Sequence, residues 1–222
     1  MNNIDIIFLH GSMHGAWCWN NFVNYLNVKG HRTFAIDFKW ENSKEIEIKD
    51  YIDILDSTVK KCNNKVVLVA HSMGSLVALN YAKFNSNKVY KIILISPLPI
   101  KNVLTSMMFI GIKMLTKSRE NLFFSENRVD NKEYYINKLR KDPIKAQIQV
   151  LKGFKTNKSI TNIPSLVLTS WNDNCVPVKF SIRTGKKLKS KIIVLNDICH
   201  DMMLDNDWEI VAKEIYDFLM TN

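Results

Sequence analysis

The most constraining feature of this sequence is a series of six short apolar runs, each separated from the next by a longer segment. The runs are rich in Val, Ile and Leu and nearly continuous in hydrophobicity, which is typical of parallel strands buried on both faces. They span Ile4–Leu9, Thr33–Ile36, Lys65–Ala70, Lys91–Ile95, Ser165–Thr169 and Lys191–Leu195. The sequence therefore predicts a central, mostly parallel six-stranded sheet.

Segments with the period of amphipathic helices lie between or after most of these runs. We expect helices over Trp17–Val28, Lys49–Cys62, Gly74–Phe84, Phe180–Leu188 and Asp207–Met220. In the last segment Trp208, Val211 and Ile215 share one face, and Asp207 can cap the first turn. Helices that alternate with strands in this way favour an α/β fold in which helices flank the sheet.

The alternation breaks between the fourth and fifth runs, at residues 98–163. This region has no strand candidate, and helical patterns cover Val103–Leu115, Lys132–Arg140 and Pro143–Phe154. We interpret it as a helical cap inserted after the fourth strand of a core made of residues 1–97 and 164–222. Core and cap are expected to form a single folding unit because no repeat or Pro/Gly/Ser-rich linker separates them.

The formal net charge of +10 raises the question of an anionic partner. The lysines are scattered along the chain, so no nucleic-acid partner is expected. The most apolar stretch, Val103–Leu115, is interrupted by Lys113 and is shorter than the roughly 20 residues of a membrane span, so stable membrane insertion is not expected. The first residues lack the pattern of a secretory signal, which favours a cytoplasmic location.

The cysteines give no sign of a metal site or of a disulfide scaffold. They are Cys18, Cys62, Cys175 and Cys199, and none belongs to a C-x-x-C pair. We therefore expect reduced thiols and no bound metal.

The strongest local signal follows the third apolar run, where Val66–Ala70 leads through His71 to Ser72 and Gly74. A strand, a sharp turn and a helix with serine at the apex form a nucleophile elbow, whose tight turn requires small residues two positions away on either side. The usual pattern is G-x-S-x-G, and Ala70 replaces the first glycine here. The alternative is that Ser72 simply caps a helix.

A second signal, the string from His10 to Trp19, directly follows the first apolar run. Acyl transfer requires N–H donors aimed at a developing oxyanion. An elbow supplies one donor from the residue after the nucleophile, here Met73, and the loop after the first strand supplies another, which we assign to Ser12. The expected pocket residues are His10, Gly11, His14, Trp17 and His71.

The order of the remaining motifs completes a catalytic triad. Asp173 follows the fifth apolar run and His200 follows the sixth, so both are expected at the sheet edge that carries Ser72. A serine hydroxyl is a weak nucleophile unless an imidazole takes its proton, and a carboxylate holds that imidazole in the required tautomer. Asp197 and Asp201 flank His200 on its own loop, and we interpret them as turn or capping residues.

On these motifs the chain resembles the α/β-hydrolase superfamily from Ile4 to Leu219. The His10 to Trp19 string is similar to that of a branch containing plant methylesterases, hydroxynitrile lyases and small bacterial esterases. The resemblance implies Ser72, Asp173 and His200 as the catalytic residues, the Ser12 and Met73 backbones as the oxyanion hole, and no cofactor.

The resemblance also limits the reaction. Hydroxynitrile lyases of this branch resemble one another in a lysine directly after the catalytic histidine, and this chain has Asp201 there, so cyanohydrin cleavage is not expected. We expect a serine hydrolase that cleaves a small-molecule carboxylic ester through an acyl-enzyme intermediate. Thioester hydrolysis, amide hydrolysis and acyl transfer use the same triad and stay open, as does a ligand-binding role without catalysis. The sequence leaves the oligomeric state unassigned.

Overall fold

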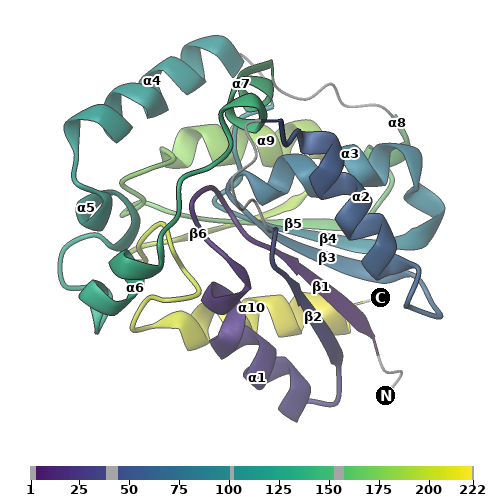
Figure 1. Ribbon diagram of the computed structural model, residues 1–222. Helices are drawn as coiled ribbons and strands as arrows, with labels where there is room; N and C mark the ends of the chain where they lie inside the picture. The colour runs from purple at the N-terminus through teal and green to yellow at the C-terminus, as the bar shows by residue number, and fades with distance from the viewer. Residues whose placement is uncertain (1–3, 39–44, 101–102, 153–157, 222) are drawn as a thin grey trace.

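One six-stranded sheet forms the centre of the molecule (Figure 1). The computed structural model describes residues 4–38, 45–100, 103–152 and 158–221. The strands are β1 (Asp5–Leu9), β2 (Arg32–Ile36), β3 (Val66–His71), β4 (Val89–Ile95), β5 (Ser165–Ser170) and β6 (Lys191–Leu195). They lie in the order β2-β1-β3-β4-β5-β6, and every neighbouring pair is parallel. The predicted six-stranded α/β sheet is confirmed.

Helices cover both faces of this sheet. In Figure 1, α1 and α10 lie below the strands, whereas α2, α3 and α9 lie above them. The α-helices are α1 (Asn20–Val28), α2 (Ile48–Val59), α3 (Gly74–Phe84), α4 (Val103–Thr116), α5 (Arg119–Phe124), α6 (Lys132–Lys138), α7 (Ile144–Lys152), α8 (Lys158–Thr161), α9 (Val178–Leu188) and α10 (Trp208–Met220). Two short 3₁₀ turns, η1 (Ala16–Trp19) and η2 (Ser86–Lys88), complete the described elements.

Several element boundaries differ from the sequence prediction. The predicted helix Trp17–Val28 is divided into η1 and α1, and the short α5 and α8 were not predicted because one or two turns are too few to show a helical period. Asp207 does not cap α10 with its side chain. Its carboxylate instead accepts a hydrogen bond from Arg128 at 2.6 Å. The predicted helix end at residues 153 and 154 lies outside the described residues.

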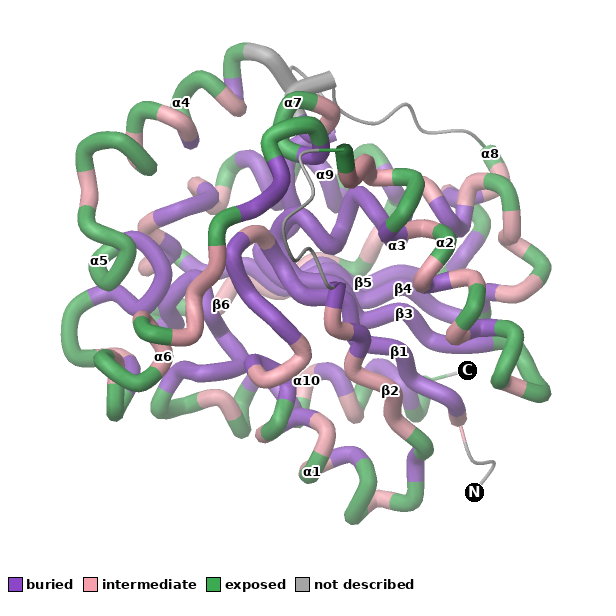
Figure 2. Tube along the Cα trace, in the orientation of Figure 1, coloured by how far each residue is buried: buried purple, intermediate pink, exposed green. Residues whose placement is uncertain are grey.

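The core follows the strands at the centre of the sheet (Figure 2). Every residue of β1, β3 and β5 is buried, whereas the edge strands β2 and β6 are mostly half-buried. Helices on both faces remove the central strands from water, which explains why their hydrophobicity is nearly continuous rather than alternating.

A buried lysine joins β4 to the end of α10. The Lys91 side chain is almost completely buried, and its ammonium group donates hydrogen bonds to the carbonyls of Phe218 and Leu219 at 2.9 and 3.1 Å. The last carbonyls of a helix have no partners within the helix and carry partial negative charge. Lys91 therefore satisfies the C-terminus of α10 against the sheet.

The chain between β4 and β5 forms α4 to α8, with no strand among its described residues. In Figure 1, α4, α5 and α6 stand apart from the sheet, on the left of the view. The division into a core of 1–97 and 164–222 and a cap of 98–163 stays a prediction. No described helix combines the length and hydrophobicity that crossing a membrane requires.

We predict opposite effects for two glycine-to-alanine substitutions. A Cβ at Gly74 would lie 2.5 Å from the Leu9 carbonyl oxygen, whereas a Cβ at Gly111 in α4 would meet nothing within 4 Å. Gly74→Ala should lower the free energy of unfolding by roughly 1–3 kcal/mol through overpacking. Gly111→Ala should raise it by about 1 kcal/mol, since alanine favours a helix interior. Urea denaturation of both variants measures this, and an unchanged Gly74→Ala would contradict the close approach of α3 to β1.

Candidate active site

The turn between β3 and α3 holds Ser72 in a strained backbone conformation. Its φ is 48°, in the left-handed region that non-glycine residues seldom occupy. The Ser72 N–H donates to the Ile95 carbonyl at 3.0 Å, and the Ser75 hydroxyl donates to the Ser72 carbonyl at 2.5 Å. These bonds hold the turn on the end of the sheet, so Ser72 occupies the apex that the elbow motif predicts.

His200 and Asp173 meet beyond the ends of β6 and β5. The His200 Nδ1 donates to both carboxylate oxygens of Asp173, at 2.9 and 3.0 Å. The Asp173 Oδ1 also accepts from the backbone N–H groups of Cys175 and Val176 at 2.8 and 2.7 Å. Donors on several sides fix the orientation of this carboxylate. Because Asp173 binds Nδ1, the ring nitrogen that can exchange a proton with a substrate or with Ser72 is Nε2.

The environment of His200 shifts its pKa. Burial alone would lower this pKa, but the charge and hydrogen bond of Asp173, together with the nearby Cys175, hold it well above the usual value near 6.5. An imidazolium at this position is therefore stabilised by its carboxylate partner.

Ser72 and His200 line the same cavity, which has a volume of about 290 Å³. Its other polar side chains include Ser12, His14, His71 and Gln147. The remaining wall is mainly apolar and comes largely from α4, α5 and α7, with Met107, Ile110, Met114, Phe123, Ile144, Ile148 and Val150. The helical segment between β4 and β5 thus supplies most of the apolar lining of this cavity.

The loop after β1 brings Ser12 to the cavity beside the elbow. Among the described residues, no backbone carbonyl accepts a hydrogen bond from the N–H of Ser12 or of Met73. Met13 has a φ of 67°, and it is held by hydrogen bonds from its N–H to Asp142 Oδ1 and from the Arg140 N–H to its carbonyl, both 2.8 Å long. The connection between α6 and α7 therefore holds this loop in its unusual conformation.

The other predicted pocket residues divide into two groups. His14 and His71 line the cavity, and the His71 Nε2 donates to the His200 carbonyl at 3.1 Å. The described lining does not include His10, Gly11 or Trp17. Gly11 lies behind it, where a Cβ would be 2.8 Å from His71 Nδ1.

His10 and Trp17 pack against neighbouring rings instead. Burial lowers the pKa of His10 to about 3, so its neutral ring accepts a hydrogen bond from the Phe38 N–H and packs against the Phe38 ring. Trp17 stacks on His14 and on Tyr135.

The two aspartates that flank His200 have other partners. Asp197 is largely exposed and pairs with Arg128, whereas Asp201 is completely buried and accepts from His14 Nε2 at 2.6 Å. Of the three aspartates, it is Asp173 whose carboxylate accepts from the His200 ring. Among the described residues, His71, His200 and Asp201 bring three potential metal-ligand atoms within 4.8 Å of one another.

Two supporting residues carried no recognisable sequence signal. Asp142 anchors the loop after β1, and Asp205 accepts a hydrogen bond from the Cys199 N–H at 2.8 Å while its oxygens pair with Arg128. Both act through contacts distant in sequence.

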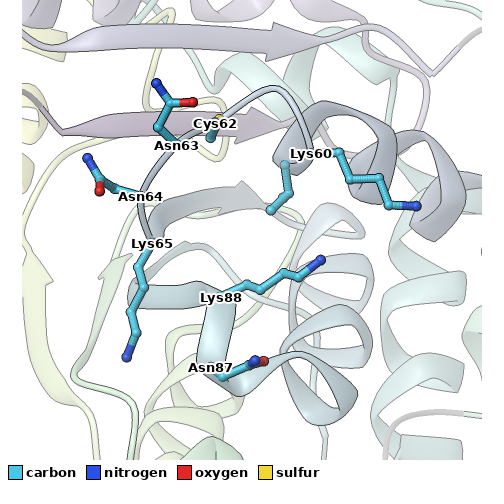
Figure 3. A pocket seen from close by; sticks show the side chains of 8 residues that line it. Lys60, Cys62, Asn63, Asn64, Lys65, Asn87 and Lys88 are labelled. Carbon is cyan, nitrogen blue, oxygen red and sulfur yellow. The ribbon is translucent and has the colours of Figure 1, made fainter.

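A second hollow lies at the opposite edge of the sheet, near the start of β3 (Figure 3). Lys60, Lys65 and Lys88 line it, and Figure 3 shows their side chains extending in different directions. These ammonium groups do not converge on one point, and the hollow is remote from Ser72, at the other end of β3. The chemistry-bearing side chains gather around the cavity instead.

Comparison with known proteins identifies related sequences and related folds. Residues 6–148 match the sequence model of the alpha/beta hydrolase family. A segment of 105 residues is 33% identical to methylesterase 7 of Arabidopsis thaliana, and a segment of 78 residues is 36% identical to methyl jasmonate esterase 1 of Vitis vinifera. These segments cover 43% and 32% of this chain.

The sequence matches span only 40% and 30% of those two relatives, so the likeness is partial. The similarity in fold extends over nearly the whole chain. A crystal structure of a polyneuridine aldehyde esterase mutant superposes with a TM-score of 0.81 at 18% identity, covering 97% of this chain and 99% of that one.

We predict that Asp173→Asn lowers the pKa of His200. The substitution removes the negative charge and one of the two acceptor oxygens that stabilise the imidazolium, while burial continues to disfavour it. An NMR titration of the ring protons should show the inflection move to lower pH. Asp197→Asn serves as the control, because Asp197 lies on the loop that carries His200 but is largely exposed. A shift of equal size in the control would show that Asp173 is not the main partner.

Proposed function

This chain belongs to the α/β-hydrolase family, and on that premise we propose that it is a serine hydrolase that cleaves carboxylic esters. In this proposal Ser72 is the nucleophile, His200 the general base and Asp173 the carboxylate that orients it. The observation that carries the proposal is the bidentate Asp173–His200 contact at the cavity into which the strained Ser72 turn opens.

The acylation step begins at the Ser72 hydroxyl. His200 Nε2 takes the proton as Oγ forms a bond to the ester carbonyl carbon, and the carbonyl oxygen becomes an oxyanion. The backbone N–H groups of Ser12 and Met73 are proposed to donate to this oxyanion, which is supported by the lack of backbone acceptors for them among the described residues. Asp173 stabilises the imidazolium throughout.

The second half of the reaction reverses these proton movements. Collapse of the tetrahedral intermediate breaks the carbon–oxygen bond to the alcohol, and His200 returns the proton to that leaving oxygen. A water molecule, deprotonated by the same imidazole, then attacks the acyl-enzyme and releases the carboxylic acid with Ser72 regenerated. The chemistry requires no group beyond the side chains and backbone of this chain.

The cavity lining indicates the class of ester. The wall contributed by α4 and α7 is mainly apolar. The volume of the cavity is that of a small-molecule site rather than of a channel for a polymer. We propose that residues 98–163 form a cap that encloses an apolar group of a small ester. The names of the relatives, a methylesterase and a methyl jasmonate esterase, support esters of a small alcohol as the first substrates to test.

We predict that Ser72→Ala lowers ester turnover by at least about 10⁴-fold, because removal of a triad nucleophile eliminates the covalent route. The measurement is hydrolysis of short-chain p-nitrophenyl esters, together with labelling by a fluorophosphonate probe and peptide mapping. The probe should label Ser72 in the wild type and nothing in the variant.

Ser57→Ala is the matched control for this experiment, since Ser57 lies on an exposed face of α2. Turnover of Ser72→Ala at the wild-type rate would contradict the proposed mechanism. Product partitioning toward a new ester when an alcohol is added would identify acyl transfer in place of hydrolysis.

We predict that kcat/KM rises with pH through an inflection above 6.5. His200 must be neutral to accept the Ser72 proton, and Asp173 raises the pKa of that imidazole, so the base is protonated and inactive on the acid side. In Asp173→Asn the inflection should move to lower pH while the maximal rate falls. A wild-type inflection below 6.5 would contradict the assigned pair.

A further inference from the structure

A second histidine–aspartate pair lies beside the first. The His14 Nε2 and the Asp201 Oδ2 are 2.6 Å apart, and their side chains are 1% and 0% exposed. Asp201 directly follows His200 in the chain, and His14 follows Ser12 by two residues. The pair therefore joins the loop that carries the base to the loop that carries an oxyanion donor.

The hydrogen bonds of His14 determine its protonation. Its Nδ1 lies 2.7 Å from the Ser12 carbonyl oxygen, which can only accept, so Nδ1 carries a proton. Its Nε2 faces the Asp201 carboxylate, and donation there makes the ring an imidazolium. Burial would lower the pKa of His14, but the Asp201 charge and hydrogen bond outweigh it and raise that pKa above the usual value.

The Ser12–Met13 peptide is held at both of its polar atoms. Its carbonyl accepts from His14 Nδ1, and its N–H donates to Asp142 Oδ1 at 2.8 Å. The N–H of Ser12 lies on the adjoining peptide, so the plane of the held peptide limits the direction in which that donor points. Met13 alone would not keep this left-handed conformation without such contacts.

We propose that the buried His14–Asp201 ion pair is a positioning unit that directs the Ser12 N–H toward the oxyanion. It also fixes the position of this donor relative to His200. The inference rests on the proposed esterase function, and neither residue is assigned a contact with the reacting atoms. Loss of the pair should reduce stabilisation of the tetrahedral intermediate more than binding of the uncharged ester.

The rings around His14 provide a substitution that isolates its hydrogen bonds. His14 stacks on Trp17 and meets the edges or faces of His71 and Phe123, with ring centroids 5.2 to 5.9 Å apart. His14→Phe keeps a planar ring among these neighbours and removes both N–H donors. Asp201→Leu keeps the approximate volume of the carboxylate and removes its acceptors.

The test compares kcat, KM and the affinity for an alkyl boronic acid, whose tetrahedral adduct with Ser72 mimics the oxyanion. In His14→Phe and Asp201→Leu, kcat should fall about 10²-fold, as for loss of an oxyanion donor, while KM stays within about threefold. The boronic acid should bind more weakly by a factor similar to the fall in kcat. Active-site titration with the fluorophosphonate corrects each rate for misfolded protein.

A conservative variant and a neighbouring control complete the design. In Asp201→Asn the amide can donate to Nε2 of a neutral His14, whose Nδ1–H still reaches Ser12, so kcat should recover about tenfold relative to Asp201→Leu. Asp197→Asn, at the exposed end of the same loop, should keep the wild-type kcat. Unchanged kcat and boronate affinity in His14→Phe would overturn the inference, as would a kcat loss explained entirely by a lower titrated fraction.

A direct measurement separates this inference from the proposed function. Absence of both ester turnover and Ser72 labelling in the wild type would contradict the proposed function, and the positioning role would fall with it. The ion pair is tested independently by ¹⁵N NMR of His14 at neutral pH. Two protonated ring nitrogens in the wild type support the pair, and a single protonated nitrogen overturns it.

Discussion

The turn between β3 and α3 is the constraint on which the rest of the structure depends. Ser72 keeps a φ of 48° because the first residues of α3 are pressed against the end of β1, where only a glycine fits at position 74. The same close approach fixes the start of α3 at the end of β1 and places Ser72 in the lining of the cavity that also contains His200. The strain of one residue is thus supported by the packing of a whole buried strand and helix.

Support for the loop after β1 comes from a different part of the chain. Arg140 and Asp142, which lie between α6 and α7, bind the carbonyl and the N–H of Met13. The same helical segment supplies the apolar wall of the cavity. A change in the position of that segment would therefore alter both the space available for a ligand and the loop that carries Ser12, which couples the shape of the pocket to its polar groups.

Buried histidines around the cavity behave differently because their partners differ. His200 and His14 each face a carboxylate that raises the pKa against the effect of burial. For His71, burial is the largest influence and the charges of His200 and His14 add to it, so its pKa is well below the usual value. A buried imidazole that faces a carboxylate is thus stabilised when protonated, whereas one that lacks such a partner is stabilised when neutral. In both the proposed base and the proposed positioning pair, a carboxylate raises the pKa of a buried histidine.

The sequence by itself determined the parallel sheet, since nearly continuous apolar runs such as Val66–Ala70, rich in valine, are typical of strands buried on both faces. It also determined that Ser72, Asp173 and His200 follow strands, and strand ends in a parallel sheet share one edge. Their assignment as a catalytic triad remains a proposal. Short helices such as α5 could not be predicted, because they have too few residues to show a helical period in the sequence.

Only the tertiary structure decided the partners of residues far apart in the chain. Asp201 reads as a turn residue from its neighbours, yet its buried carboxylate faces His14, which is 187 positions away in sequence. Asp142 and Lys91 are similar cases, each hydrogen-bonded to backbone groups distant in sequence. The local sequence pattern indicates which face of a helix or strand is apolar. The partner of a buried polar side chain depends instead on which buried donors and acceptors lack a hydrogen bond once the elements have packed.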